Sequence, residues 1–132
     1  MTITSQPVLV TGASGFLAIH CVIQLLEQGY NVRGTLRTMS RENDVRVVIR
    51  KFVQADDRLE FVPADLINDA GWNQAAQGCE YVFHVASHFP LLEPKHEDEL
   101  IKPAVEGTQR VLRAAHAAHV KRVIQVSSNA AI

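Results

Sequence analysis

Three small residues, Gly12, Gly15 and Ala18, stand at regular spacing between two apolar stretches. The stretch before them, residues 7–10, is short and rich in β-branched residues, which is typical of a buried parallel strand. After them, apolar residues recur at helical spacing until Gly29, a residue type that favours the end of a helix. The small residues therefore lie in a turn between a strand and a helix.

A turn of this kind suits the binding of a phosphate group. Gly12 permits the tight turn, Gly15 lets a ligand approach the backbone, and Ala18 lets the helix pack closely on the sheet. The free N–H groups at the helix start and the helix dipole both favour an anion over the turn. Because strand, turn and helix follow in the order of a βαβ unit, we predict that this turn binds a dinucleotide pyrophosphate. A tight turn without a ligand would use the same residue types.

The composition is that of an ordinary soluble globular domain. The 132 residues suffice for one domain with a hydrophobic core, and 47% of them are apolar and 20% charged. The net charge of −1 gives no electrostatic argument for binding nucleic acid or an anionic membrane. No apolar run is as long as a membrane span, and the opening MTITSQP contains no signal core. We therefore predict a cytoplasmic protein that binds neither nucleic acid nor membrane.

The cysteines and histidines give little indication of a disulfide or a metal site. Cys21 and Cys79 lie in apolar surroundings without partner spacing, so we expect both to be reduced. Two histidine pairs have a spacing that could suit a metal: His84 with His88, and His116 with His119. No cysteine or carboxylate completes either set, and the second pair lies where a helix C-terminus favours a cation. No metal site is predicted.

The rest of the chain repeats the alternation of strand and helix. Further strands are predicted at residues 30–37, 59–66, 81–87 and 122–128, and further helices after Ser40, over 69–78 and from about Glu99 to His116. Such alternation predicts an α/β fold: a Rossmann-like, doubly wound parallel sheet with strand order 3-2-1-4-5. Residues 81–87 are apolar on both faces, so this strand should be central. The ligand should bind between strands 1 and 4, at their carboxyl ends.

Two of the helices carry more detailed expectations. Ser40 should cap the second helix, whose buried face would consist of Val45, Val48, Ile49 and Phe52, with Arg46, Arg50 and Lys51 largely outward. Phe52 and Trp72 are expected in the core rather than as platforms for a ligand. In the long helix, Pro103 marks either the start or a kink.

Six segments together resemble a known family: TGASGFLA, VRGTLR, ADL, VFHVAS, KPAVEGTQRVLRAA and VKRVIQVSS. In this order they are similar to the N-terminal half of an extended short-chain dehydrogenase/reductase, in the NAD-dependent epimerase/dehydratase superfamily. The resemblance spans nearly the whole chain and is greatest to the dihydroflavonol-reductase and aldehyde-reductase branch. It implies a Rossmann fold, a nicotinamide cofactor, and reduction of a carbonyl or oxidation of the corresponding alcohol.

The choice of cofactor depends on the end of the second strand. NAD-binding Rossmann proteins usually place a carboxylate there, whereas an arginine nearby accommodates a 2′-phosphate. Here the strand ends in Thr35-Leu36-Arg37, without an acidic residue. By resemblance Arg37 contacts the 2′-phosphate, with assistance from Arg33 or Arg41. NADP(H) is therefore favoured over NAD(H), the alternative being that Arg37 is a solvated surface side chain.

The resemblance also assigns cofactor contacts beyond the first two strands. Asp65 would reach the adenine amino group and Leu66 would pack beside the ring, although an aspartate after a strand often caps a turn. Ala86, with Val85 and Ser87, would line the ribose next to the nicotinamide. The predicted cofactor contacts are Gly12, Ser14, Gly15, Phe16, Leu17, Arg37, Asp65, Leu66, Val85, Ala86 and Ser87. His88 stands where the branch often has proline, which puts the shape of the following loop in doubt.

Ser128 matches the family serine that orients the substrate carbonyl by a hydrogen bond. Ser127 is its rival, because neighbouring residues of a strand point to opposite faces and only one can face the site. A pair of purely structural serines at a strand end is the alternative.

The family's catalytic tyrosine, which lies four residues before a lysine, has no counterpart in this sequence. Tyr30 is followed at that spacing by Gly34, and Tyr81 by Val85. We therefore expect residues 1–132 to form an incomplete NAD(P)-binding Rossmann domain without the Tyr-Lys segment and the substrate domain. The apolar ending favours a fragment or a truncated reading frame over a completed small protein. An uncovered fifth strand, together with the long fourth helix, would favour self-association.

Three functions are compatible with these observations. The first is the NADP(H)-binding portion of an aldehyde or ketone reductase, inactive as it stands and able to take a small carbonyl substrate only in a full-length form. The second is a non-catalytic dinucleotide-binding or redox-sensing module. The third is part of a nucleotide-sugar epimerase or dehydratase.

Overall fold

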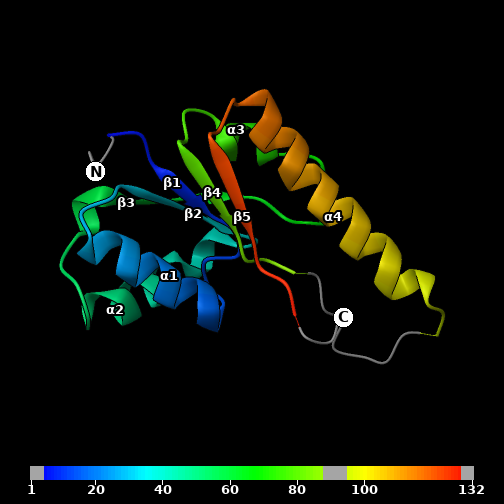
Figure 1. The fold of residues 1–132 in the computed structure, drawn as a ribbon. Helices are drawn as coiled ribbons and strands as arrows, with labels where there is room; N and C mark the ends of the chain where they lie inside the picture. Colours follow the sequence, from blue (N-terminus) through cyan, green and yellow to red (C-terminus); the bar gives the residue numbers. More distant parts are fainter. Residues whose placement is uncertain (1–4, 88–94, 129–132) are drawn as a thin grey trace.

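The computed structural model of the chain describes residues 5–87 and 95–128, and Figure 1 shows its parallel sheet. Within these residues the strands are β1 (Val8–Val10), β2 (Val32–Leu36), β3 (Leu59–Pro63), β4 (Tyr81–His84) and β5 (Arg122–Gln125). They form one sheet in the order β3-β2-β1-β4-β5, with every neighbouring pair parallel. This order confirms the predicted doubly wound architecture, and β4 lies inside the sheet as expected.

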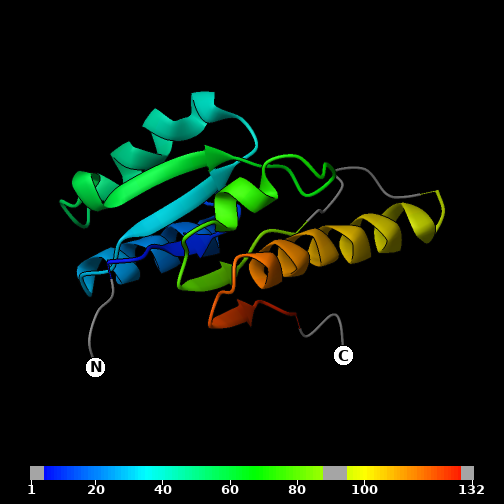
Figure 2. The ribbon, with the colours of Figure 1, turned by 90° about the horizontal axis from the view of Figure 1, so that it is seen from above.

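Helices cover both faces of this sheet (Figures 1 and 2). The helices are α1 (Phe16–Glu27), α2 (Glu42–Arg50), the short α3 (Trp72–Ala76) and α4 (Asp98–Ala117), with the 3₁₀ turns η1 (Met39–Arg41) and η2 (Asp56–Arg58) between strands β2 and β3. α1 and α2 share one hydrophobic cluster with the sheet, and α3 and α4 share another. The two clusters lie on opposite faces.

The alternation of side chains along β1 shows why two cores form. Val8 and Val10 belong to the cluster under α1 and α2, whereas Leu9 between them belongs to the cluster under α3 and α4. Successive residues of a strand point to opposite faces, so an all-apolar strand feeds both cores at once. All three side chains are at most 1% exposed. Each such burial stabilises the fold by about 1.5–3 kcal/mol.

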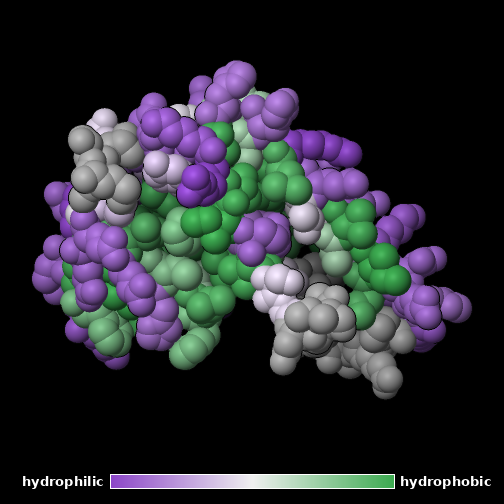
Figure 3. All heavy atoms as spheres, viewed as in Figure 1, coloured by the Kyte–Doolittle hydropathy of each residue, from purple (hydrophilic) through white to green (hydrophobic). Residues whose placement is uncertain are grey.

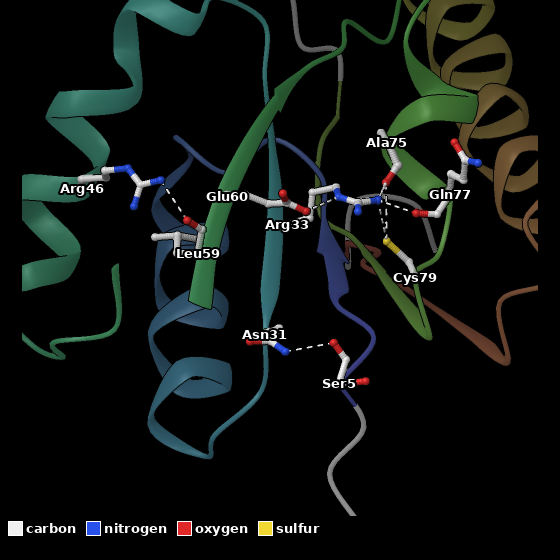
Figure 4. Close-up of polar contacts among 9 residues, drawn as sticks. All are labelled: Ser5, Asn31, Arg33, Arg46, Leu59, Glu60, Ala75, Gln77 and Cys79. Carbon is white, nitrogen blue, oxygen red and sulfur yellow. Dashed lines mark hydrogen bonds and ion pairs between the residues drawn. The ribbon is translucent and has the colours of Figure 1, made fainter. Parts of the chain in front are cut away.

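The start and the polar side of α2 differ from the prediction. Ser40 does not cap this helix, because it lies inside η1 and Arg41 is the N-cap residue. Arg46 is also not outward: only 15% of its side chain is exposed, and it donates to the Leu59 carbonyl at 2.8 Å (Figure 4). Its guanidinium lies 5.1 Å from the centre of the Phe61 ring. The Arg46 side chain thus lies against an aromatic ring while its guanidinium donates to a carbonyl group of β3. Arg50 and Lys51 are exposed, as predicted.

Phe52 is not part of the core. Its side chain is 59% exposed, because α2 ends at Arg50 and the helical spacing that would have buried the ring no longer applies. The Phe52 ring instead lies 6.4 Å from the His20 ring on α1. Val48 is also partly exposed, at 37%, so only Val45 and Ile49 form the buried face of α2. The prediction of a core position is confirmed for Trp72, which is 3% exposed.

The long helix α4 begins at Asp98 and continues through Pro103, so the helix does not start at that proline. None of the helices in the part of the chain described by the structure is long and apolar enough to cross a membrane. The α4 helix exposes Leu100, Ile101, Val105 and Leu112. Beside it, Ile124 of β5 is 44% exposed, and Figure 3 shows apolar side chains on this side of the molecule. Self-association through this surface stays a prediction.

Candidate functional site

A pocket of about 450 Å³ opens at the carboxyl ends of the strands, where β1 pairs with β2 on one side and with β4 on the other. A volume of this size lies within the usual range for small-molecule sites. Its lining consists of Gly12, Ser14, Gly15, Phe16, Leu17, Ala18, Thr35, Arg37, Ala64, Asp65, Leu66, Trp72, Val85, Ala86 and Ser87. All of the cofactor contacts named from the sequence are therefore brought together. Ala18, Thr35, Ala64 and Trp72 also line the pocket but were not named as contacts.

The first glycine of the turn is required by the backbone. Gly12 has a φ of +64°, which side-chain-bearing residues rarely adopt, and a Cβ there would lie 2.9 Å from the Ala86 Cβ. The Gly12 N–H donates to the Thr35 hydroxyl at 2.9 Å. Thr35 also holds the next residue, since its carbonyl accepts from the Ala13 N–H at 2.8 Å. These contacts fix the turn against β2 and against the loop after β4.

The second glycine leaves space rather than providing a special conformation. Gly15 has φ −74° and ψ 155°, values open to any residue, and it is the N-cap residue of α1. Within residues 5–87 and 95–128, a Cβ at Gly15 would meet only the Gly12 carbonyl oxygen, at 3.3 Å. The N–H groups of the first helical turn lack intrahelical partners and lie next to the pocket. A glycine here therefore keeps the approach to these N–H groups open.

The arginines at the end of β2 differ in their positions. Arg37 is exposed and lines the main pocket, and together with Arg41 it also lines a small adjoining pocket of about 60 Å³. Arg33 does not line either pocket, so the prediction that it assists Arg37 is wrong. It pairs with Glu60 at 2.6 Å and donates to the carbonyls of Ala75 and Gln77, at 2.8 and 2.6 Å (Figure 4). The reason is its place early in β2, about 13 Å along the extended chain from Arg37.

The loop after β3 is held by a hydrogen bond within the loop and by others from α3 and α4. The Asp65 carboxylate accepts from the Ile67 N–H at 3.3 Å, so the turn-capping alternative for this residue is observed, while Asp65 also lines the pocket. Trp72 donates from Nε1 to the Asp65 carbonyl at 3.0 Å. Arg110 of α4 donates to the Leu66 carbonyl at 2.7 Å. Trp72 thus combines a core position with a role in shaping the pocket wall.

Thr11 and His84 hold the loop after β4, and neither was named as a site residue from the sequence. The Thr11 hydroxyl lies 2.8 Å from His84 Nδ1 and 2.9 Å from the backbone nitrogens of both Val85 and Ala86. Burial lowers the pKa of His84 to about 4. The signal available in the sequence was a single histidine within the apolar run VFHVA, which requires a buried partner.

We expect this buried histidine to make stability depend on pH. The folded-state pKa of His84, about 4, lies below the usual value of 6.5, so the unfolded chain binds the proton more tightly. Neutral His84 then contributes about 3 kcal/mol to the free energy of unfolding. This contribution is fully present above pH 6.5 and is lost as the pH falls towards 4. Urea unfolding of the wild type and of His84→Asn between pH 7 and pH 4 measures it. A wild-type profile parallel to that of His84→Asn would contradict this expectation.

The predicted catalytic serines lie outside the pocket lining. Ser127 and Ser128 follow β5 and are both exposed. The loop that leads to them is joined to β4 by the Val126 N–H, which donates to the His84 carbonyl at 3.1 Å. The role of Ser128, and the choice between it and Ser127, stay predictions.

The histidine and cysteine side chains of the described residues have the following surroundings. His84 Nδ1 is bonded to Thr11, and His88 lies outside the described residues. Among residues 5–87 and 95–128, no three histidine, cysteine, aspartate or glutamate side chains come together as a metal site would require. Cys21 and Cys79 are both free thiols, and burial raises the pKa of each.

Comparison with known proteins agrees with this architecture. Residues 8–132 match the NAD dependent epimerase/dehydratase family. The chain is 42% identical over 128 residues to tetraketide alpha-pyrone reductase 1 of Arabidopsis thaliana, covering 95% of this chain and 38% of that protein. It is 41% identical over 123 residues to dihydroflavonol 4-reductase of Hordeum vulgare, covering 92% of this chain and 34% of that protein.

A solved structure shows the same arrangement of elements. The yeast methylglyoxal/isovaleraldehyde reductase Gre2, complexed with NADPH, superimposes with a TM-score of 0.80 at 27% identity, covering 96% of this chain and 38% of that one. The chain thus spans a little more than a third of the length of the proteins it matches.

Proposed function

The chain belongs to the NAD dependent epimerase/dehydratase family, and we propose that it is the NADP(H)-binding part of a carbonyl reductase that acts on an aldehyde or a ketone. The observation that carries the proposal is the pocket at the strand ends, which gathers a glycine turn, a helix start and Arg37 at the end of β2, where residues 35–37 include no acidic residue. Relatives named as reductases, and one complexed with NADPH, support the reaction class and the cofactor.

The residues of the pocket suit the parts of a dinucleotide. The N-terminus of α1 would hold the pyrophosphate, since helix starts favour anions and Gly15 leaves the N–H groups accessible. Arg37, with Arg41 beside it, would pair with the 2′-phosphate through a planar guanidinium. Asp65 and Leu66 would hold the adenine. When bound, the reduced nicotinamide supplies a hydride, and the residues after β4 would line its ribose.

The prediction that tests cofactor choice concerns Arg37. NADPH should bind at least about tenfold more tightly than NADH, because a charge-assisted contact to phosphate contributes about 1.5–3 kcal/mol. Arg37→Ala should reduce this preference to near unity and leave NADH affinity unchanged. Isothermal titration calorimetry at moderate salt measures both affinities. Arg113→Ala, which removes an exposed arginine from α4 away from the pocket, serves as the matched control. Equal affinities of the wild type for NADPH and NADH would refute the assignment.

A second candidate function is a non-catalytic dinucleotide-binding or redox-sensing module. Within residues 1–132 neither tyrosine stands four residues before a lysine, so this stretch by itself offers no proton donor of that pattern. This second candidate shares the cofactor site with the first proposal and differs from it only in turnover by the whole protein. The third function, part of a nucleotide-sugar epimerase or dehydratase, has the family name in its favour, whereas the relatives described above are named as reductases.

A further inference from the structure

The Thr11 hydroxyl is the centre of a buried group of hydrogen bonds at the strand ends. Its oxygen lies 2.9 Å from the Val85 nitrogen, 2.9 Å from the Ala86 nitrogen and 2.8 Å from His84 Nδ1. Thr11 is fully buried and His84 is 1% exposed. The two residues are 73 positions apart in sequence and join the end of β1 to the end of β4.

The count of hydrogens fixes the direction of each bond. A hydroxyl oxygen accepts two hydrogen bonds and donates one. The Val85 and Ala86 N–H groups can only donate, so they occupy both acceptor positions of the Thr11 oxygen. The hydroxyl hydrogen must therefore go to His84 Nδ1, which accepts it. A neutral imidazole that accepts at Nδ1 carries its proton at Nε2.

This arrangement places the loop after β4 against the glycine turn. Ala86 is held by Thr11, and Gly12 follows Thr11 directly, with so little room that a Cβ at Gly12 would lie 2.9 Å from the Ala86 Cβ. Gly12 and Ala86 both line the pocket. Two walls of the pocket are thus joined through one hydroxyl whose orientation depends on the histidine.

We propose that His84 is a positioning residue for the dinucleotide site: by accepting the Thr11 hydroxyl hydrogen, it fixes the backbone of residues 85 and 86 against the phosphate-binding turn. This inference rests on the proposed function of the pocket. His84 does not itself line the pocket and acts through Thr11.

The surroundings of His84 suit a ring that is neutral at pH 7. Val82, two residues earlier on β4, packs with Trp72 and Val111 in the cluster under α3 and α4, so the His84 side chain lies on that face. On α4, Arg110 is engaged by Asp69 at 2.7 Å and by Glu106 at 3.8 Å. On β5, the residue paired with His84 is the neutral Gln125. The low pKa of His84 keeps the ring uncharged at pH 7.

The test compares two substitutions of His84. Asparagine places an amide oxygen near the position of Nδ1 and can accept the Thr11 hydrogen, whereas leucine cannot. His84→Leu should weaken NADPH binding about tenfold, because a buried hydroxyl loses its acceptor and no longer fixes the loop. His84→Asn should restore affinity to within about threefold of the wild type. His116→Asn, on the exposed end of α4, should have no effect.

A spectroscopic measurement separates positioning from general stability. In the wild type, the ¹⁵N shifts of His84 should show an unprotonated Nδ1 and a protonated Nε2. Thr11→Val should remove the hydroxyl without adding volume, weaken NADPH binding to the same extent as His84→Leu, and shift the Val85 and Ala86 amide resonances. If His84→Leu does not fold, the NADPH affinity of Thr11→Val and the ¹⁵N shifts of His84 still test whether the bond between the two residues positions the loop.

Each outcome has a definite consequence. A wild-type chain that binds no dinucleotide would refute the proposed function itself. A wild-type chain that binds NADPH, together with Thr11→Val or folded His84→Leu of equal affinity, would refute only the role of His84. A protonated Nδ1 would refute it as well.

Discussion

Replacement of Gly15 by valine is expected to abolish dinucleotide binding while the chain stays folded. The Gly15 backbone has φ −74°, so a side chain is compatible with the local conformation. Among the described residues a Cβ there would meet only the Gly12 carbonyl oxygen, at 3.3 Å, and the rest of the valine would project into the pocket. A pyrophosphate that needs the N–H groups of the α1 start would then collide with two methyl groups. Affinity for NADPH should fall by at least about a hundredfold, equivalent to about 2.7 kcal/mol.

Calorimetric titration with NADPH measures the loss, and circular dichroism with urea unfolding checks the fold. Ala117→Val is the matched control, because it adds the same two methyl groups at an exposed position near the end of α4. Unchanged affinity in Gly15→Val would mean that the turn is only structural.

Gly12→Ala should behave differently, since a Cβ at φ +64° would lie 2.9 Å from the Ala86 Cβ and would therefore destabilise the protein itself.

Much of this site could be predicted because its parts are local patterns. The spacing of Gly12, Gly15 and Ala18 places a turn between strand and helix, and the end of β2 is recognisable from Arg37. In a parallel sheet the carboxyl ends of neighbouring strands meet at one edge, so residues far apart in sequence converge there without further information. The pocket lining therefore contains every predicted cofactor contact.

The errors concern side chains whose environment depends on neighbouring elements. Arg33 does not assist Arg37, because the carbonyl groups at the end of α3 hold its guanidinium at the other end of the strand. The core position predicted for Phe52 requires a helix that continues past Arg50, whereas α2 ends at that residue. Helix ends and ion-pair partners are both set by tertiary contacts, which a local sequence pattern does not contain.

The pair formed by Thr11 and His84 was missed for a related reason. A threonine before a glycine turn and a histidine in an apolar strand are each unremarkable alone. Their bond joins residues 73 positions apart, and only the adjacency of β1 and β4 brings them together. Doubly wound order predicts that adjacency, so a buried histidine at the end of one central strand can be matched to a hydroxyl at the end of the other.

The 132-residue chain is expected to bind NADPH but to show no turnover above background with a panel of aldehydes and ketones. Transfer of a hydride to a carbonyl carbon leaves negative charge on the oxygen, which must take up a proton. General acid catalysis contributes about 10²–10⁴-fold, and the tyrosine and lysine that the family resemblance implies for this step do not occur at the required spacing in these residues. An unperturbed serine hydroxyl is too weak an acid to replace them.

The decisive comparison joins residues 1–132 to the remaining part of a matching reductase, such as the Hordeum vulgare dihydroflavonol 4-reductase, of which the match covers 34%. This chimera should oxidise NADPH in the presence of that relative's substrate, because it regains the proton donor and the groups that position the carbonyl. Ser128→Ala in the chimera should lower the rate sharply, whereas Ser127→Ala should lower it much less, if Ser128 is the residue that holds the carbonyl. NADPH oxidation by the 132-residue chain alone, abolished by Ser128→Ala, would show instead that these residues already contain the catalytic machinery. An inactive chimera that still binds NADPH would contradict the expectation that these residues form a reductase's cofactor site in a catalytically competent position.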